Sequence, residues 1–289
     1  MYKNVDMSAY TSMKTGGRAK VCYFPESIEE LVERVRLLEK GKDKYYILGN
    51  MSNVLLPDGD IPFIPVVTTK VNKTIITENN DETVFVYAEC GVSFTKLAYE
   101  MSKKGYDGLT FAYGIPGSVG GAVFMNAGAY GSEISEVVNY VDCMDAKSGE
   151  IIRFSKEECD FSYRHSAFSE NGYVILGTEL VLKKGNAQEI TEKAKQTMQK
   201  RIDKQPLEYP SCGSAFKRPC GYFAGELIEK SGLKGYCVGG ACVSEKHAGF
   251  IINKAGATSQ DVKELIHQVQ KKVKEGFGVE LEPEIRILD

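Results

Sequence analysis

The sequence predicts an α+β protein. Two observations favour this class: strand-like and helix-like segments alternate without a regular period, and no internal repeat is visible. At 289 residues the chain is long enough for two domains or three small ones, each with its own core. We expect three units.

The first predicted unit covers residues 1–70. Its helix, Ser27 to Glu39, starts with a capping box of a serine and a glutamate and carries an apolar face at helical spacing. Two strands with a glycine-containing turn between them follow over Tyr45 to Leu56, and another strand covers Phe63 to Val67.

The second predicted unit covers residues 71–205. It is rich in short strands, such as Thr83 to Cys90 and Val174 to Leu182. One helix interrupts them, from a cap at Ser93 to Gly105. A polar helix over about residues 187–203 then leads into the third unit.

The third predicted unit covers residues 206–289. It contains a helix from about Phe223 to Ser231 and a strongly amphipathic helix that begins at Ser259. Glycines 276 and 278 end that second helix, and a final strand over residues 279–288 closes the chain.

Composition excludes several classes of function. The net charge is −3 with both signs mixed along the chain, so no basic stripe indicates a nucleic-acid partner. The eight cysteines form no CxxC pair and there are only three histidines, so no metal site is expected. No apolar run suggests a signal peptide or a membrane span. We expect a cytoplasmic protein with reduced, mostly buried cysteines, no membrane association and no obligate protein partner. Whether Cys212, Cys220, Cys237 and Cys242 are ever oxidised stays open at this point.

The segment from Gly114 to Gly131, GIPGSVGGAVFMNAGAYG, contains six glycines. Successive backbone N–H groups in such a segment can form a concave anion site, for which a phosphate or pyrophosphate is the natural ligand. A structural glycine corner remains the alternative. Interleaved apolar residues argue against a flexible linker, and the glycine spacing does not match the GxGxxG of a Rossmann domain.

A second glycine-bearing turn, Gly49 to Asn53, lies far from the first in the sequence. The two turns could cradle one extended ligand with two phosphates between the first two units, such as a flavin dinucleotide.

Seven blocks of the chain, in this order, resemble the UDP-N-acetylenolpyruvoylglucosamine reductase family, also called UDP-N-acetylmuramate dehydrogenase or MurB. The length is similar to the shorter, type II class. The blocks are TSMKTGGRA (11–19), LGNMSNVLL (48–56), GIPGSVGGAVFMNAGAYG (114–131), FSYRHSAF (161–168), SCGSAFKRP (211–219), GGACVSEKHAGFIIN (239–253) and LEPEIRIL (281–288).

The resemblance implies a non-covalent FAD between the two N-terminal units, in the fold of vanillyl-alcohol-oxidase-type (PCMH-type) flavoproteins. It also implies a C-terminal substrate-binding domain whose last strand, about 280–289, returns toward the flavin site. The implied reaction converts UDP-N-acetylglucosamine enolpyruvate to UDP-N-acetylmuramate with NADPH, in the synthesis of bacterial peptidoglycan precursors, on which the cell wall, cell shape and cell division depend.

The implied chemistry is a hydride transfer from reduced flavin to the enolpyruvyl β-carbon and a proton transfer to the α-carbon. Ser214 matches the family's proton donor, Arg164 its partner for the substrate carboxylate, and Glu284 the glutamate that assists charge delocalisation or proton relay. From spacing alone, a turn serine, a surface ion pair and an exposed strand glutamate would be the ordinary interpretations.

The resemblance and the glycine turns also indicate binding residues. Substrate contacts are expected at Tyr163, Arg164, Lys217, Arg218 and His247, although the family often has asparagine in place of Arg218. Cofactor contacts are expected at Gly49, Asn50, Met51, Ser52, Asn53, Gly114, Ile115, Pro116, Gly117, Ser118, Gly120, Gly121, Asn126, Gly128 and Tyr130.

Met51 departs from the family's GxGSN pattern in the first turn. If this position has a positive φ, methionine is strained there, which predicts weaker retention of FAD. A fully occupied, tightly held FAD in the purified protein would contradict this prediction.

Two other functions remain open. One is another FAD oxidoreductase of the same fold, which would not need Ser214 together with Glu284. The other is a sugar-nucleotide-binding protein that has lost catalysis, against which the intact catalytic residues argue.

Overall fold

A computed structural model describes all residues, 1–289. The chain divides into two compact units, and each is built from separate stretches of sequence. The first unit comprises Met1, 22–50 and 63–200, and the second comprises 2–21, 51–62 and 201–289. The division into 1–70, 71–205 and 206–289 therefore stays a prediction.

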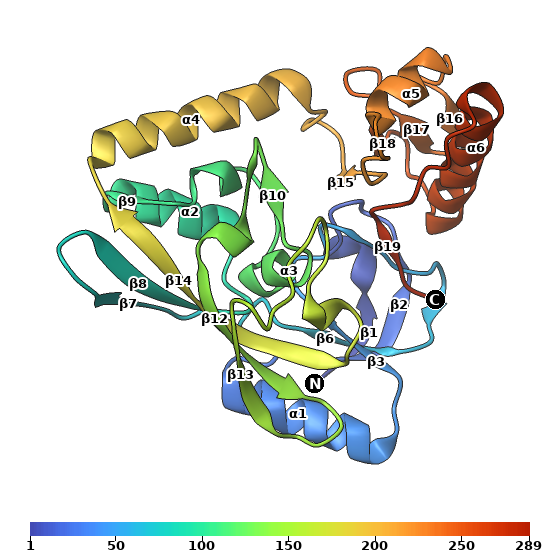
Figure 1. Cartoon of the computed structure of the whole chain (residues 1–289). Helices are drawn as coiled ribbons and strands as arrows, with labels where there is room; N and C mark the ends of the chain where they lie inside the picture. Colours follow the sequence, from blue (N-terminus) through green and yellow to red (C-terminus); the bar gives the residue numbers. More distant parts are fainter. The chain divides into compact units, whose positions relative to one another are not determined.

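An antiparallel sheet forms the centre of the first unit, with the strand order β13-β12-β14-β8-β7 (Figure 1). Strand β9 pairs with the end of β14. Alternate residues of β8 are buried, which is the period of two expected where one face of a sheet packs on a core. A separate parallel pair, β3 and β6, follows helix α1. The strands of this unit are β3 (Tyr45–Leu48), β6 (Ile64–Val67), β7 (Thr74–Glu78), β8 (Thr83–Glu89), β9 (Tyr106–Asp107), β10 (Gly128–Ala129), β11 (Ser132–Glu133), β12 (Val138–Asp145), β13 (Ile151–Ser155) and β14 (Tyr173–Lys184).

The three helices predicted in this part of the chain are present: α1 (Ile28–Gly41), α2 (Phe94–Lys103) and α4 (Ala187–Lys204), whose last turn passes into the second unit. A fourth, short helix, α3 (Val119–Phe124), was not predicted and lies inside the glycine-rich segment. The Ser27 hydroxyl accepts from the Glu30 N–H at 3.2 Å, as a capping box requires. The Glu30 carboxylate, however, accepts from Glu26 rather than from Ser27.

The second unit contains a four-stranded sheet with the order β15-β18-β17-β16, beside which helices α5 and α6 lie (Figure 1). Two smaller sheets, β1-β2-β5 and β4-β19, join its N-terminal stretches and its C-terminus. The elements are β1 (Tyr2–Asp6), β2 (Arg18–Cys22), β4 (Val54–Leu55), β5 (Asp60–Ile61), β15 (Ser211–Ser214), α5 (Ala224–Lys230), β16 (Cys237–Val238), β17 (Ala241–Val243), β18 (Phe250–Asn253), α6 (Ser259–Phe277) and β19 (Arg286–Ile287).

The final strand is much shorter than predicted. Only Arg286 and Ile287 pair as a strand, in parallel with Val54 and Leu55. Before them, Pro283 makes an isolated bridge to Phe216. Proline has no N–H to donate to a ladder, so a continuous strand through this position is disfavoured.

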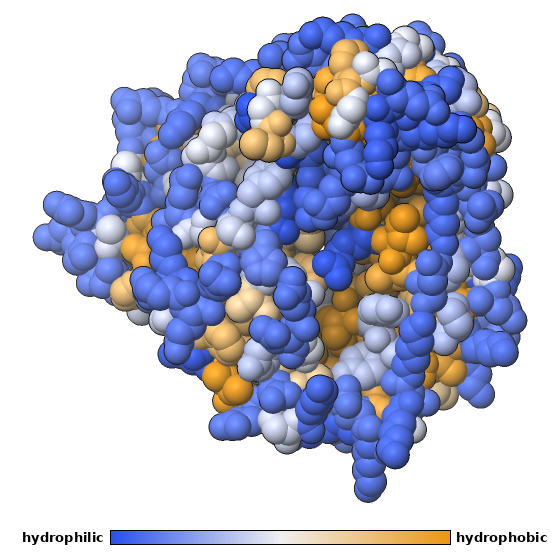
Figure 2. All heavy atoms as spheres, turned by 45° about the vertical axis from the view of Figure 1, so that its right-hand side comes forward, coloured by the Kyte–Doolittle hydropathy of each residue, from blue (hydrophilic) through white to orange (hydrophobic).

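Each unit has its own apolar core. Figure 2 shows mainly hydrophilic side chains on the visible face, with apolar side chains in separate patches. No helix has the length and apolarity needed to cross a membrane.

Cysteine oxidation differs from the prediction. Cys237 and Cys242, two of the four cysteines whose redox state the sequence left open, face each other across the β16–β17 hairpin and form a disulfide, so the general expectation of reduced cysteines is wrong for this pair. The reason is the tight turn at Gly239 and Gly240, which places the two cysteines at facing positions. Cys90 and Cys212 are free and buried, and burial raises the pKa of both thiols to about 12.

Candidate active site

The glycine-rich segment surrounds the start of helix α3. Ser118 precedes the helix, and its hydroxyl accepts from the Gly121 N–H at 3.2 Å. Gly114 has φ +83°, a conformation that favours glycine. At Gly120 a Cβ would lie 2.9 Å from the Cβ of Cys90, so this glycine is required by close packing. The interpretation as a structural corner therefore applies to Gly120.

The first residues of the second glycine turn contact this segment within the first unit. A Cβ at Gly49 would lie 2.2 Å from the Ser118 hydroxyl, so only glycine fits there. The Asn50 side-chain amide donates to the Pro116 carbonyl at 3.0 Å. The structure thus brings together two predicted cofactor turns that lie more than sixty residues apart.

The N–H groups of this region provide the test of whether a flavin dinucleotide fits. Those of Gly49, Asn50, Gly117 and Ser118 donate to no acceptor of the protein. Ser118 is buried, and a buried N–H without a partner is uncommon in folded proteins. Unpaired N–H groups on adjacent turns are the donors that a pyrophosphate needs, so these residues fit FAD.

The rest of the predicted turn, Met51 to Asn53, belongs to the second unit. Met51 has φ +47° and its side chain is 4% exposed, so the methionine does occupy left-handed backbone. Asn53 donates from its amide to the Glu284 carbonyl at 2.9 Å and accepts from the Arg286 N–H at 3.0 Å. The C-terminal segment therefore lies against the end of this turn.

Arg164 lies in a tight turn of the first unit. The backbone N–H and C=O groups of Ser162 and His165 pair with each other, both at 3.2 Å, which leaves Tyr163 and Arg164 at the tip. Arg164 has φ +56°, and its guanidinium donates to the Gly128 carbonyl at 3.2 Å. The guanidinium also lies 5.0 Å from the centre of the exposed Tyr163 ring. Of the predicted substrate residues, Arg164 thus contacts the predicted cofactor residue Gly128, and Tyr163 lies beside Arg164.

Tyr130 is the tip of a neighbouring hairpin between β10 and β11. Its φ is +56° and that of Gly131 is +88°, as a two-residue hairpin turn requires. The ring is about half exposed.

Ser214 and Glu284 approach each other through the backbone of the second unit. Ser214 ends β15 and is exposed, and it pairs with Phe250 of β18. The next residue, Ala215, accepts from the Glu284 N–H at 2.9 Å. Asn53 holds the carbonyl of Glu284, so the glutamate backbone is fixed on both sides.

Lys217 and Arg218 line a cavity of about 370 Å³ in the second unit. Lys217 forms an ion pair with Glu282 at 2.6 Å, and the Arg218 guanidinium lies 3.9 Å from the centre of the Phe223 ring. Cys220 and Tyr222 also line this cavity, and sequence reasoning did not select them.

His247 is positioned by a tight loop. Its Nδ1 accepts from the Gly249 N–H at 3.1 Å, and its ring packs against Phe250 at 5.0 Å between ring centres. Burial lowers its pKa below the ordinary value of histidine. His247 does not line the cavity of Lys217 and Arg218.

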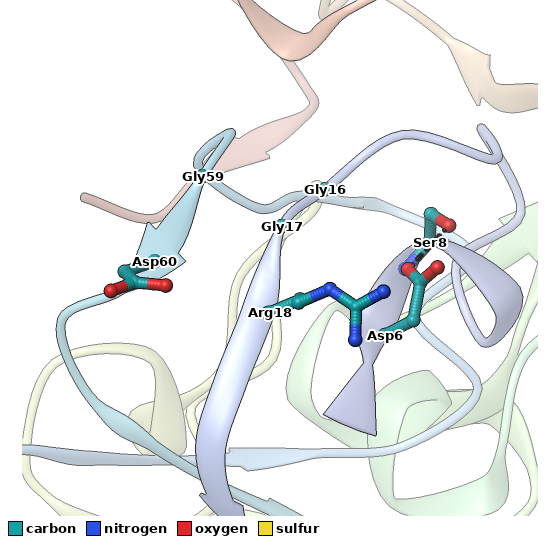
Figure 3. Close-up of a pocket in the computed structure, with 7 residues that line it drawn as sticks. All are labelled: Asp6, Ser8, Gly16, Gly17, Arg18, Gly59 and Asp60. Carbon is teal, nitrogen blue, oxygen red and sulfur yellow. Dashed lines mark hydrogen bonds between the residues drawn. The ribbon is translucent and has the colours of Figure 1, made fainter. Parts of the chain in front are cut away.

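A second surface pocket, of about 350 Å³, contains none of the predicted residues (Figure 3). In it the Asp6 carboxylate accepts from the hydroxyl and the N–H of Ser8. The Arg18 side chain points toward Asp6. The structure has no group of three or more metal-ligating side chains.

Two protein-family models match the chain, over separate ranges of residues. The sequence model described as "UDP-N-acetylenolpyruvoylglucosamine reductase, C-terminal domain" matches residues 205–288, and the model described as "FAD binding domain" matches residues 19–155.

Proteins that match this chain over nearly its whole length carry the same reductase name. The UDP-N-acetylenolpyruvoylglucosamine reductase of Clostridium novyi is 48% identical over 285 residues, which cover 99% of this chain and 91% of the relative. That of Caldanaerobacter subterraneus subsp. tengcongensis is 45% identical over 288 residues, covering 100% and 93%. The crystal structure of the reductase (MurB) from Thermus caldophilus matches with a TM-score of 0.84 at 31% identity, over 99% of this chain and 98% of the other.

The FAD binding domain and the glycine turns with unpaired N–H groups define a flavin-dependent oxidoreductase. More specifically, the chain belongs to the UDP-N-acetylenolpyruvoylglucosamine reductase family. The predicted family, the α+β flavoprotein fold and FAD as cofactor are confirmed.

Proposed function

We propose that this protein reduces UDP-N-acetylglucosamine enolpyruvate to UDP-N-acetylmuramate in the cytoplasm, with NADPH as the reductant, as a step of peptidoglycan precursor synthesis. Bound FAD would supply the hydride chemistry, between NADPH and the β-carbon of the enolpyruvyl double bond. The observation that carries the proposal is the backbone hydrogen bond from the Glu284 N–H to Ala215, the residue that follows Ser214, because it supports a joint role for these two residues in the second unit.

Ser214 donates the proton that completes the reduction at the α-carbon. An ordinary hydroxyl is a weak acid, so the developing negative charge on the substrate must be stabilised as the proton moves. Glu284 relays a proton back to Ser214. Two features support this assignment: Ser214 is exposed at the end of its strand, and Glu284 is held by Ala215 and Asn53.

Arg164 binds the substrate carboxylate, with Tyr163 beside it. A planar guanidinium suits a carboxylate because it can donate two parallel hydrogen bonds. Lys217 and Arg218, which line one cavity, bind the diphosphate of the UDP-sugar, and His247 maintains the loop next to β18. Gly49, Asn50, Ser52, residues 114–121, Gly128 and Tyr130 are the residues that would hold FAD.

The first test is the visible spectrum of the purified protein under anaerobic conditions. We expect flavin bands that bleach with NADPH and return only when the enolpyruvyl substrate is added. A protein that lacks flavin and cannot be reconstituted with FAD would instead support the sugar-nucleotide-binding alternative.

The second test separates the two half-reactions in Ser214→Ala. Flavin reduction by NADPH should stay at the wild-type rate, while reoxidation by the substrate slows by about 10²–10⁴-fold, the range for loss of a general acid. Ser211→Ala, at the other end of β15, is the matched control and should affect neither step. Equal losses in both half-reactions would contradict the role of Ser214.

A further inference from the structure

Asn126 has a side-chain amide that is fully used inside the first unit. Its Nδ2 donates to the Glu133 carboxylate at 2.8 Å and to the Ser162 carbonyl at 3.0 Å. Its Oδ1 accepts from the Ser135 N–H at 3.2 Å. The residue is 0% exposed and has φ +42°. Both amide hydrogens are therefore committed to protein acceptors.

The acceptor Ser162 is the first residue of the turn that carries Arg164. Asn126 thus holds the beginning of that turn, while the Gly128 carbonyl, two residues further along the same segment, accepts from the Arg164 guanidinium. One short stretch of chain contacts the Arg164 turn at its base and at its tip.

The turn needs such support. Arg164 has φ +56°, and a left-handed backbone disfavours any residue with a Cβ. Strained residues of this kind persist only where the surrounding structure determines them. The amide of Asn126 provides such a determinant from a buried position that water does not reach.

A direct contact of Asn126 with FAD, as its sequence context predicts, needs a free donor. Neither amide hydrogen is available without breaking a buried hydrogen bond, either to the Ser162 carbonyl or to the Glu133 carboxylate, which also accepts from the Ser135 hydroxyl.

We propose that Asn126 is a positioning residue, which orients Arg164 for the substrate carboxylate and does not contact the flavin. The proposal rests on the proposed function, since that function assigns the carboxylate to Arg164. Without the hydrogen bond from Asn126, the Arg164 turn adopts other conformations as well. Only a fraction of the molecules then orients Arg164 toward the substrate carboxylate, and the apparent substrate affinity is the intrinsic affinity multiplied by that fraction.

The experiment uses the FAD-loaded protein and two variants of Asn126. Asn126→Gly removes the amide and tolerates the positive φ, and Asn126→Asp keeps the shape but replaces both donors. Asn4→Gly is the matched control, because Asn4 also has a positive φ (+54°) but is exposed. The measurements are the dissociation constant of FAD by flavin fluorescence, the rate of flavin reduction by NADPH, and the substrate concentration that half-saturates flavin reoxidation.

We expect both Asn126 variants to raise the half-saturating substrate concentration by about tenfold, the effect of losing one or two buried hydrogen bonds. Binding of FAD and reduction by NADPH should stay within about twofold of wild type, and Asn4→Gly should change nothing. In a double-mutant cycle, Asn126→Gly should add no further loss to Arg164→Ala, because it acts through that arginine.

Three results would overturn the proposal: FAD binding weakened as much as substrate binding, losses that multiply in the double variant, or the same loss in the Asn4 control. If the wild-type flavin itself is not reoxidised by the enolpyruvyl substrate, the proposed function fails instead, and the two failures are distinguishable.

Discussion

Met51 affects the free energy of unfolding in two opposite ways, through the strain of its left-handed backbone and through the burial of its side chain. Replacing Met51 by glycine relieves a strain of about 1 kcal/mol, which the entropy of glycine in the unfolded chain largely offsets. The change also removes a side chain that is 4% exposed, whose burial contributes about 1.5–3 kcal/mol.

We therefore expect Met51→Gly to lower the free energy of unfolding by about 1–2 kcal/mol, measured by urea denaturation. A rise in stability would show that strain dominates. The same variant tests the prediction about FAD: tighter FAD binding than in wild type would support weaker retention because of Met51.

His247 predicts a pH dependence. Burial lowers its pKa, so the unfolded chain binds a proton more readily than the folded protein does. By linkage, the stability from a neutral His247 is complete above the ordinary histidine pKa of about 6.5 and is lost as the pH falls below it.

His247→Asn, which keeps an acceptor for the Gly249 N–H, should flatten the fall of the unfolding free energy between about pH 6.5 and 5. The measurement is urea unfolding at several pH values. The same replacement at His267, exposed on α6, is the control for the loss of a histidine as such. An unchanged slope in His247→Asn would contradict the prediction.

At the scale of elements, α6 receives its N-terminal cap from a distant stretch of chain. Its first two N–H groups, of Ser259 and Gln260, both donate to the Asp58 carboxylate at 2.9 Å. Thr258 and Asp261 add a capping box. A carboxylate at this end of a helix also interacts favourably with the helix dipole.

Asp58→Asn should therefore lower the free energy of unfolding by about 1–2 kcal/mol. Asp60→Asn, two residues away and outside the cap, should change it by less than about 0.5 kcal/mol. Thermal or urea unfolding monitored by circular dichroism measures both, and equal effects would argue against the cap.

At the other end of α6, replacing each of two glycines by alanine should change the stability in opposite directions. Gly276 lies inside the helix, and a Cβ added there would meet no other atom within 4 Å, whereas Gly278 follows the helix with φ +68°. Gly276→Ala should stabilise the protein by about 0.5–1 kcal/mol, and Gly278→Ala should destabilise it by about 1 kcal/mol. Opposite signs in one unfolding assay would support the assignment, and equal signs would contradict it.

The helices were the elements most readily predicted from sequence, because caps and apolar spacing are local signals. The predicted start of α6 at Ser259 and the predicted cap of α2 at Ser93 agree with the structure. The short strand β19 depends on pairing with β4, more than two hundred residues away, which no local pattern indicates. The facing cysteines of the disulfide escaped prediction for a related reason, since their pairing follows from a hairpin register.

For the candidate site, too, some features could be predicted from local sequence signals and others could not. Glycine turns signalled an anion cradle from composition alone, whereas the roles of Ser214, Arg164 and Glu284 came only from the family resemblance. The internal bonding of Asn126 could not be predicted, because its partners Glu133 and Ser162 are defined by folding.

At the scale of the whole molecule, the second unit requires all three of its stretches. Met13 and Leu55 are fully buried in the core formed mainly by residues 201–289, and Asp58 caps α6. Burying two such side chains contributes about 3–6 kcal/mol, which is comparable to the net stability of a small domain.

A fragment of residues 201–289 should therefore fail to unfold cooperatively, although it contains the region that matches the C-terminal domain model. Circular dichroism during urea titration is the measurement, with the full chain as control. A sharp transition at the midpoint of the full chain would show that the fragment folds independently.

The composition of the second unit also has a consequence during protein synthesis. Residues 2–21 are synthesised before the rest of the second unit, but the core in which Met13 is buried is completed only after residues 201–289 have been made. At about 5–20 residues per second, this N-terminal stretch waits on the order of ten seconds or longer for its partners. Its apolar side chains are exposed to chaperones for that time, and a premature stop codon before residue 201 would leave them without a core.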